Sequence, residues 1–285
     1  MIVIGTRGSA LALAQARIVA SALGADVEVR TIMTAGDRSD RPIRELGDGV
    51  FVTAIEDALR AKEVDVAVHS LKDLPTAEPD DLTIAAIPVR EDPRDVVITR
   101  ARGGVGDLAA GARVGTSSPR RDAFLSALVP GIVCAEIRGN VDTRLRKVRD
   151  GEYDATVLAA AGLRRLGVDF ADDEALPLAV CPPAPGQGAL AVQMRADDPA
   201  AQRVRAALEH RPTRVAVETE REVLRLAGAT CLLPLGVYAR DEGGEIVVDA
   251  ALAADGVIRH AHARGREQRE VAQRVADALG VLVRA

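Results

Sequence analysis

The chain has 285 residues, of which 48% are hydrophobic and 28% are charged, and its formal net charge is −5. This length is enough for two or three globular domains. The acidic balance, with only 2% aromatic residues and no Trp, argues against a general nucleic-acid binder, which needs a basic surface or aromatic stacking platforms.

Membrane and metal-binding classes are also disfavoured. The sequence contains no stretch of about 18 uncharged apolar residues, and the N-terminus "MIVIGTRGSALALAQ" does not resemble a secretory signal. We therefore expect a cytoplasmic protein that does not bind membranes. The three cysteines, Cys134, Cys181 and Cys231, are far apart and odd in number, so neither a disulfide framework nor a zinc site is expected.

Through the first two thirds of the chain, short apolar runs alternate with amphipathic helical patterns. The apolar runs predict strands at residues 2–5, 27–33, 64–68, 82–87, 96–99, 113–115, 133–137 and 155–159. Helical periodicity predicts helices at residues 9–23, 51–62, 119–129 and 141–149. Such alternation is typical of parallel sheets with crossover helices, so we expect an α/β fold.

A similarity between two segments of the chain indicates two such domains. The stretches "VIGTRGSALALAQARIV" and "RVGTSSPRRDAFLSALV" both read as a strand, Gly-Thr, small polar residues and a helix. They begin two halves of similar size, which predicts two α/β domains with a junction near residues 88–95. The alternative is a chance likeness between two strand-to-helix turns.

After "CPPAPGQGALAVQ" the pattern changes. Helices are predicted at residues 198–210 and 214–227, followed by strands at 235–240, 246–252 and 257–263. The strands are separated by "DEGG" and "ADG", which are hairpin signals. A last helix at 267–279 ends at Gly280. These elements predict a small α+β domain with three antiparallel strands.

Lys72 and Asp73 follow the predicted strand at residues 64–68, in the stretch "VHSLKDLPT". Ligands of α/β proteins bind outside the carboxyl ends of strands, so an active site is expected here. A carboxylate beside a cation can stay ionised, stabilise positive charge that develops on a substrate, or move a proton. The alternative is that Lys72 and Asp73 form an ordinary ion pair in a surface turn. His69 is interpreted as a histidine packed at the end of the strand.

Basic residues gather in the second α/β half. Residues 113–149 contain eight Lys or Arg against three acidic residues, in a chain of net charge −5. The stretches "GTSSPRR" and "IRGNVDTRLRK" place Arg120, Arg121 and Arg138 at helix starts or strand ends, where backbone N–H groups also favour anions. Because a guanidinium pairs bidentately with carboxylate or phosphate, this predicts a ligand with several acidic groups. Arg146, Lys147 and Arg149 fit a solvated helix face.

Cys231 lies in "LAGATCLLPLGVYA", a loop of small residues between a predicted helix and a predicted strand. A lone cysteine is usually an inert buried residue, and its position alone does not assign it a function.

The segments "VHSLKDLPT", "VGTSSPRR", "IRGNVDTRLRKV", "YDATVLAAAGLRRLG", "PAPGQGALAVQ" and the Cys231 loop occur in this order. Together they closely resemble hydroxymethylbilane synthase, also called porphobilinogen deaminase, over essentially the whole chain. The resemblance implies two lobes similar to periplasmic binding proteins and a small α+β C-terminal domain with a three-stranded antiparallel sheet. It also implies that the first lobe recovers the stretch after Gln187. This gives residues 1–90 and 189–208 to the first lobe, 91–188 to the second and 209–285 to the third domain.

The resemblance implies a transferase of tetrapyrrole biosynthesis that acts as a monomer. Four porphobilinogen units are joined head to tail with loss of ammonia, and water then releases hydroxymethylbilane. The chain grows on a dipyrromethane cofactor, which by position is thioether-linked to Cys231. Because each pyrrole carries an acetate and a propionate, the growing chain is a polyanion, which agrees with a row of arginines in an acidic protein.

The resemblance also implies roles for individual residues. Asp73 would be the catalytic group, as electrostatic stabiliser and proton shuttle. Besides Cys231, the residues that hold the cofactor would be Ser70, Lys72, Asp73, Thr116, Ser117, Ser118, Arg120, Arg121 and Gln187. Substrate or the elongating chain would be held by Arg7, Ser9, Arg138, Arg144 and Arg165.

Two departures from the family pattern stand out. Asp48 in "LGDGVF" replaces a lysine that is frequent in the family, although Arg44 could compensate, and Ala229 and Thr230 precede the cysteine where glycines are common. The alternatives are a pseudoenzyme of the same family, or a two-lobed binding protein that closes on a small polyanion. The latter does not explain a third domain that presents a cysteine.

Overall fold

The structure is a computed structural model that describes residues 1–24, 26–38, 49–228 and 233–281. The chain divides into two compact units. The first comprises Met1–Glu91 and Ala189–Arg214, and the second comprises Asp92–Gly188 and Val215–Ala285. Among the described residues, no helix has both the length and the apolar character needed to cross a bilayer.

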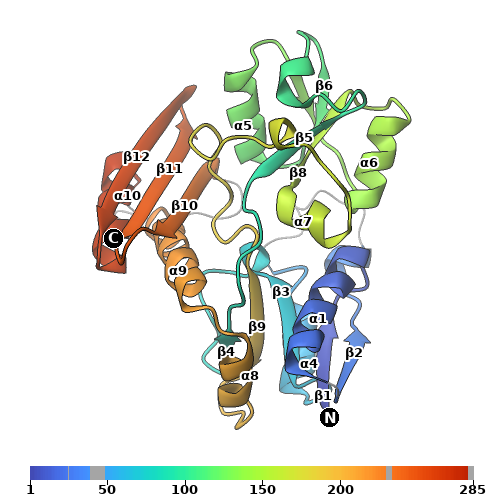
Figure 1. The fold of residues 1–285 in the computed structure, drawn as a ribbon, viewed down its shortest axis with the longest axis vertical. Coiled ribbons are helices and arrows are strands. Elements are labelled where there is room, and N and C mark those ends of the chain that lie inside the picture. Colours follow the sequence, from blue (N-terminus) through green and yellow to red (C-terminus); the bar gives the residue numbers. More distant parts are fainter. Residues whose placement is uncertain (25, 39–48, 229–232, 282–285) are drawn as a thin grey trace. The chain divides into compact units, whose positions relative to one another are not determined.

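The first unit is built on one five-stranded sheet in the order β2-β1-β3-β9-β4 (Figure 1). Its elements are β1 (Ile2–Thr6), α1 (Ala10–Leu23), β2 (Val27–Thr31), α2 (Ala35–Arg38), α4 (Thr53–Arg60), β3 (Val66–Ser70), the 3-10 turn η1 (Leu71–Asp73), β4 (Leu82–Ala86), β9 (Leu190–Arg195) and α8 (Ala201–Leu208). Strands β1, β2 and β3 are parallel, whereas β9 runs antiparallel between β3 and β4. The return of the chain as β9 was implied by the resemblance and is confirmed.

Strand β3 is buried on both faces, with Val66 and Val68 in one apolar cluster and Ala67 in another, which explains its continuous apolar run. Helix α1 buries Ala12, Gln15, Ala16 and Val19, the spacing of a single helix face. Its N-terminus is capped by Ser9, whose hydroxyl accepts the backbone N–H of Ala12 at 3.2 Å.

The second unit contains a four-stranded sheet in the order β5-β8-β6-β7. Its elements up to residue 174 are β5 (Asp95–Thr99), η2 (Gly104–Asp107), β6 (Arg113–Gly115), α5 (Pro119–Leu128), β7 (Val133–Ala135), α6 (Val141–Arg149), β8 (Ala155–Ala159), α7 (Ala160–Arg165) and η3 (Asp172–Glu174). Strands β6, β7 and β8 are parallel and β5 is antiparallel to β8. The carboxyl ends of the parallel strands and the amino end of β5 therefore share one edge of this sheet.

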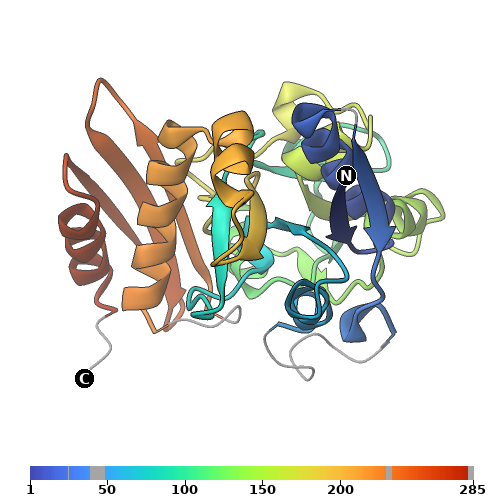
Figure 2. The same ribbon diagram turned by 90° about the horizontal axis from the view of Figure 1, so that it is seen from below.

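The rest of this unit is a three-stranded antiparallel sheet flanked by two helices (Figure 2). It consists of α9 (Arg211–Leu226), which belongs to this unit from Val215 onward, β10 (Leu235–Asp241), β11 (Ile246–Ala254), β12 (Val257–Gly265) and α10 (Gln268–Leu279). One face packs against α9 and α10, and on the other face Ala251 joins the apolar cluster that contains Phe124 of α5. Gly280 ends α10 with φ 71°, as its sequence position predicts.

These observations confirm the α/β class and the three-stranded antiparallel sheet. The predicted helix start at residue 214 is wrong: α9 begins at Arg211. Pro212 lies in its first turn, where the missing N–H is not needed. The predicted helix at 198–210 is shorter in the structure, where α8 covers Ala201–Leu208. Because the C-terminal sheet and the second lobe fall in one unit, a separate third domain from residue 209 stays a prediction.

Candidate functional site

The predicted catalytic loop lies at the carboxyl edge of the first unit's sheet. Strands β1 and β3 are parallel neighbours, with Ile4 paired to Val66 and Gly5 to Ala67. The residues that follow each strand are therefore brought to the same edge. These residues are Arg7 and Ser9 after β1, and Ser70, Lys72 and Asp73 at the end of β3 and in η1.

A small cavity of about 70 Å³ lies at this edge. Four of the predicted residues line it, namely Arg7, Ser9, Ser70 and Asp73. Asp73 is exposed to solvent, whereas Lys72 is half-buried and does not line the cavity. The structure thus brings the proposed catalytic carboxylate and a guanidinium into one pocket.

Gln15 and Phe51 also line this pocket. Gln15 of α1 donates from Nε2 to Oγ of Ser70 at 2.9 Å, which fixes that hydroxyl. The guanidinium carbon of Arg7 lies 3.9 Å from the ring centroid of Phe51, a cation–π contact that orients Arg7. Gln15 and Phe51 were not among the predicted site residues. The available signal for Gln15 was its polar side chain on the apolar face of a helix.

His69 is buried at the wall of the same pocket. Burial, together with the positive charge of Arg7, lowers the pKa of His69 to about 4. The imidazole is therefore neutral near pH 7, and the pocket contains one buried neutral base beside an exposed carboxylate.

The second predicted set lies at the shared edge of the second unit's four-stranded sheet. Thr116, Ser117 and Ser118 form the turn from β6 into α5. Oγ of Ser118 accepts the backbone N–H of Arg121 at 3.4 Å and caps the helix, and Pro119 occupies its first turn. Oγ of Ser117 donates to the carbonyl of Ile137 at 2.7 Å and links this turn to the end of β7.

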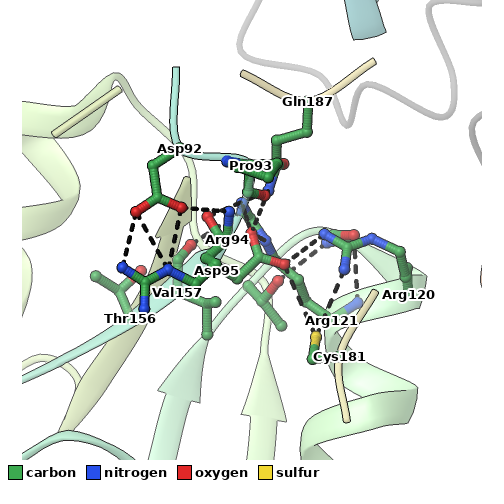
Figure 3. A network of polar contacts seen from close by, with 12 residues as sticks. Asp92, Pro93, Arg94, Asp95, Arg120, Arg121, Thr156, Val157, Cys181 and Gln187 are labelled. Atoms are coloured by element: carbon green, nitrogen blue, oxygen red, sulfur yellow. Dashed lines mark hydrogen bonds and ion pairs between the residues drawn. The ribbon is translucent and has the colours of Figure 1, made fainter. Parts of the chain in front are cut away.

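Arg120 and Arg121 are buried and share one carboxylate (Figure 3). Asp95, the first residue of β5, accepts Arg120 Nη2 at 2.6 Å, Arg121 Nη2 at 2.6 Å and Arg121 Nε at 3.0 Å. Burial alone would raise the pKa of Asp95, but the charges of Arg120 and Arg121 lower it well below its usual range. Asp95 was not a predicted site residue, although a charge at the start of an apolar run was its visible signal.

A group of positive charge surrounds Arg144 of α6. Its Nε donates to the carbonyl of Gly139 at 2.9 Å. Burial and the neighbouring charges of Arg121 and Arg138 lower the pKa of Arg144 to about 10. The charges of Arg121 and Arg138 thus act unfavourably on the Arg144 guanidinium, and a bound anion would relieve that repulsion.

Arg165 and Gln187 make hydrogen bonds near two of the points where the chain passes between the two units. Arg165 Nη2 donates to the carbonyl of Gly188 at 2.6 Å. Gln187 is only 1% exposed, and its Nε2 donates to the carbonyl of Pro93 at 2.8 Å and to Asp95 Oδ1 at 2.9 Å. Both residues thus fix the backbone beside the arginine cluster, and their predicted ligand contacts stay predictions.

Cys231 lies outside the described residues, as do Arg44, Asp48, Ala229 and Thr230. Among the described residues, no cluster of three or more His, Cys, Asp or Glu side chains is placed to hold a metal ion.

The two edges offer complementary chemistry. The first unit presents the exposed carboxylate of Asp73 in a cavity that Arg7 also lines, and a carboxylate can stabilise positive charge or exchange a proton. The second presents several guanidiniums and a capped helix N-terminus, the donors that bind carboxylates.

Comparison with known proteins identifies relatives of the chain. Residues 2–203 match the family model described as "Porphobilinogen deaminase, dipyromethane cofactor binding domain". A protein named porphobilinogen deaminase from a Roseiflexus species is 47% identical over 260 residues, which is 89% of this chain and 86% of that protein. Proteins of the same name from Thermus thermophilus and Mycobacterium bovis are 48% and 49% identical, covering 90% and 88% of this chain and 85% and 84% of their own lengths.

Proposed function

The chain belongs to the porphobilinogen deaminase family, and we propose that it condenses four porphobilinogen molecules head to tail on a covalently bound dipyrromethane primer. Ammonia is released at each condensation and hydroxymethylbilane is released by hydrolysis, which makes the chain a transferase of tetrapyrrole biosynthesis. The observation that supports this most directly is the group of Arg121, Arg138 and Arg144, in which burial and then the charges of Arg121 and Arg138 lower the pKa of Arg144 to about 10. Such a group fits a substrate and product that carry acetate and propionate side chains.

The residues of the second unit fit the dipyrromethane group. The carboxylates of the dipyrromethane could accept hydrogen bonds from the N–H groups of Arg121 and from the hydroxyls of Thr116 and Ser117. When bound, the dipyrromethane supplies the pyrrole carbon to which the first substrate unit is joined. Cys231 is the proposed attachment point, because the family resemblance places the cofactor cysteine in this loop.

The proposed role of Asp73 follows from its charge and position. Porphobilinogen becomes positively charged as it loses ammonia, and a fixed carboxylate stabilises that charge. The same carboxylate can take up a proton that is displaced from a pyrrole ring. Arg7 and Ser9, which line the same cavity, would hold the substrate carboxylates.

We further propose that the chain works in the cytoplasm as a monomer on a small-molecule substrate, without nucleic acid or membrane. The net charge of −5 and the family resemblance support this assignment. Light scattering of the purified protein checks the monomer.

The intact mass of the denatured protein tests the proposed function. Wild-type protein made with ample porphobilinogen should carry the mass of two condensed pyrrole units, and the Cys231→Ser variant should lack it. An unmodified wild-type mass would instead favour a binding protein or an inactive relative.

A further inference from the structure

Asp95 lies at the centre of a buried polar network at the shared edge of the second unit's four-stranded sheet. It has no solvent-exposed surface, and it accepts hydrogen bonds from Arg120, Arg121 and Gln187 (Figure 3). Two guanidiniums share this single carboxylate. The network therefore keeps one excess positive charge at the edge where ligand carboxylates are expected.

The hydrogen bonds of Arg121 show how the network directs this charge. A guanidinium has five N–H groups. In Arg121, two of these donate to Asp95 Oδ1, from Nε and Nη2, and one donates from Nη1 to the carbonyl of Val157 at 3.0 Å. Two N–H groups remain, one on Nη1 and one on Nη2, and Asp95 determines the direction in which they point.

Arg120 is bonded differently. Its Nη2 contacts Asp95, while its Nη1 donates to the carbonyl of Pro182 at 2.8 Å and lies 3.6 Å from Sγ of Cys181. Gln187, which follows in the same segment, donates hydrogen bonds from Nε2 to Asp95 Oδ1 and to the carbonyl of Pro93. The same carboxylate therefore ties together the start of β5, helix α5 and the segment 181–187.

Two roles for Asp95 predict opposite effects on anion binding. If Asp95 only balances charge, its neutralisation raises the local positive charge and strengthens the binding of any anion. If Asp95 orients Arg121, its neutralisation releases the guanidinium, and a ligand that needs a defined donor geometry binds more weakly.

We propose that Asp95 is a positioning residue for the recognition of porphobilinogen-type carboxylates by Arg121. The rigid acceptor set around Arg121, which also includes the carbonyl of Val157, supports this role over charge balance. The inference rests on the proposed function and deepens it.

The experiment is a calorimetric titration of the full chain in a Cys231→Ser background, in which no cofactor is attached. Porphobilinogen and inorganic sulfate are the two probes, and Asp95→Asn is the variant. The Kd for porphobilinogen should rise about tenfold, which reflects the loss of a well-oriented charge-assisted pair. The Kd for sulfate, which needs less defined geometry, should stay the same or fall. Unchanged or tighter porphobilinogen binding overturns the proposal.

Glu174→Gln is the matched control. Glu174 is also buried, at 1% exposure, and is paired with Arg102 in the same unit. Its variant should leave both Kd values unchanged, and an effect equal to that of Asp95→Asn would reduce the role of Asp95 to general stability.

Gln187→Met keeps both ion pairs and therefore tests the idea even if Asp95→Asn does not fold. It should raise the Kd for porphobilinogen about threefold, because Asp95 loses one neutral donor; no change would contradict the proposal. The inference fails together with the proposed function if the Cys231→Ser parent does not bind porphobilinogen. If that parent binds but wild-type protein carries no pyrrole adduct, only the proposed function fails.

Discussion

Asp73 and His69 line the same pocket but differ in their exposure to solvent. Asp73 is exposed at the end of η1, whereas His69 is buried on β3, and burial lowers the pKa of His69 to about 4. Near neutral pH the imidazole of His69 is therefore uncharged. His69 therefore cannot supply the negative charge that we propose Asp73 provides to a substrate cation.

Replacement of Asp73 by Asn should lower turnover by at least about 100-fold, because the amide neither stabilises a cation nor accepts a proton. Because Asp73 is exposed, the fold should be preserved, which circular dichroism checks. Asp80→Asn is the matched control, since Asp80 is also exposed in the same unit but does not line the cavity. Near-normal turnover by Asp73→Asn would remove Asp73 from the mechanism.

Protonation of His69 should make the protein less stable in mild acid. In the folded state its pKa is about 4, against 6.5 in the unfolded chain, so between these values the unfolded chain binds more protons. Stability therefore falls as the pH drops from 6.5 to about 4, by a total on the order of 3 kcal/mol.

Urea unfolding of the wild type and of His69→Gln at pH 7 and pH 5 measures this effect. The variant should lose less stability between the two pH values than the wild type. The control is His260→Gln, because His260 is exposed. This variant should lose as much stability between the two pH values as the wild type. Equal pH dependence of His69→Gln and wild type would show that His69 is not the group responsible.

At the scale of the elements, helix caps can be separated from ligand contacts. Ser118 caps α5 and Asn140 caps α6, where its Oδ1 accepts the backbone N–H of Thr143 at 3.0 Å. Ser118→Ala and Asn140→Ala should each cost about 1 kcal/mol of stability. Only Ser118→Ala should also reduce the cofactor mass in the intact-mass measurement, because Ser118 alone is a proposed cofactor contact. If the Ser118→Ala variant carries the full cofactor mass, Ser118 caps the helix but does not contact the cofactor.

Strong periodicity made most elements predictable from the sequence. The apolar runs and the helical faces correspond to β1, β3, β6, β8, α1 and α5 with shifts of a few residues. The errors are local: α9 begins at Arg211, three residues before the predicted start, with Pro212 in its first turn, and β5 begins at Asp95, one residue before the predicted strand. Sequence periodicity cannot show that a buried aspartate will find two arginines 25 and 26 residues away.

The candidate site was predictable only in part, for the same reason. Residues next to strand ends, such as Arg7 and Asp73, could be assigned to one edge because parallel strands end together. Gln15 and Phe51 enter the pocket from α1 and from the segment before α4, and only the packing of these elements shows it. The role of Gln187 could not be read from "PGQGA" either, since its amide turns to Asp95 and Pro93.

At the scale of the whole molecule, the C-terminal sheet is joined to the second lobe by an apolar contact. Ala251 of β11 is fully buried in a cluster with Phe124 of α5, and a Cβ on Gly236 of β10 would lie 2.2 Å from the carbonyl oxygen of Pro182. Such close packing leaves no room for water, and it agrees with the grouping of these parts in one unit. Parts that share a core in this way are expected to unfold together.

Hydrogen exchange measured by mass spectrometry, with Ala251→Asp as the variant, tests this coupling. A charge placed at this buried position has no partner and should destabilise the contact by several kcal/mol. Because the two parts share the contact, amide protection should fall both in residues 92–188 and in residues 233–281, while residues 1–91 keep theirs. If protection falls in residues 233–281 alone, the C-terminal sheet unfolds independently, as expected of the separate third domain that the sequence predicts from residue 209. The same variant therefore decides between one cooperative unit and two.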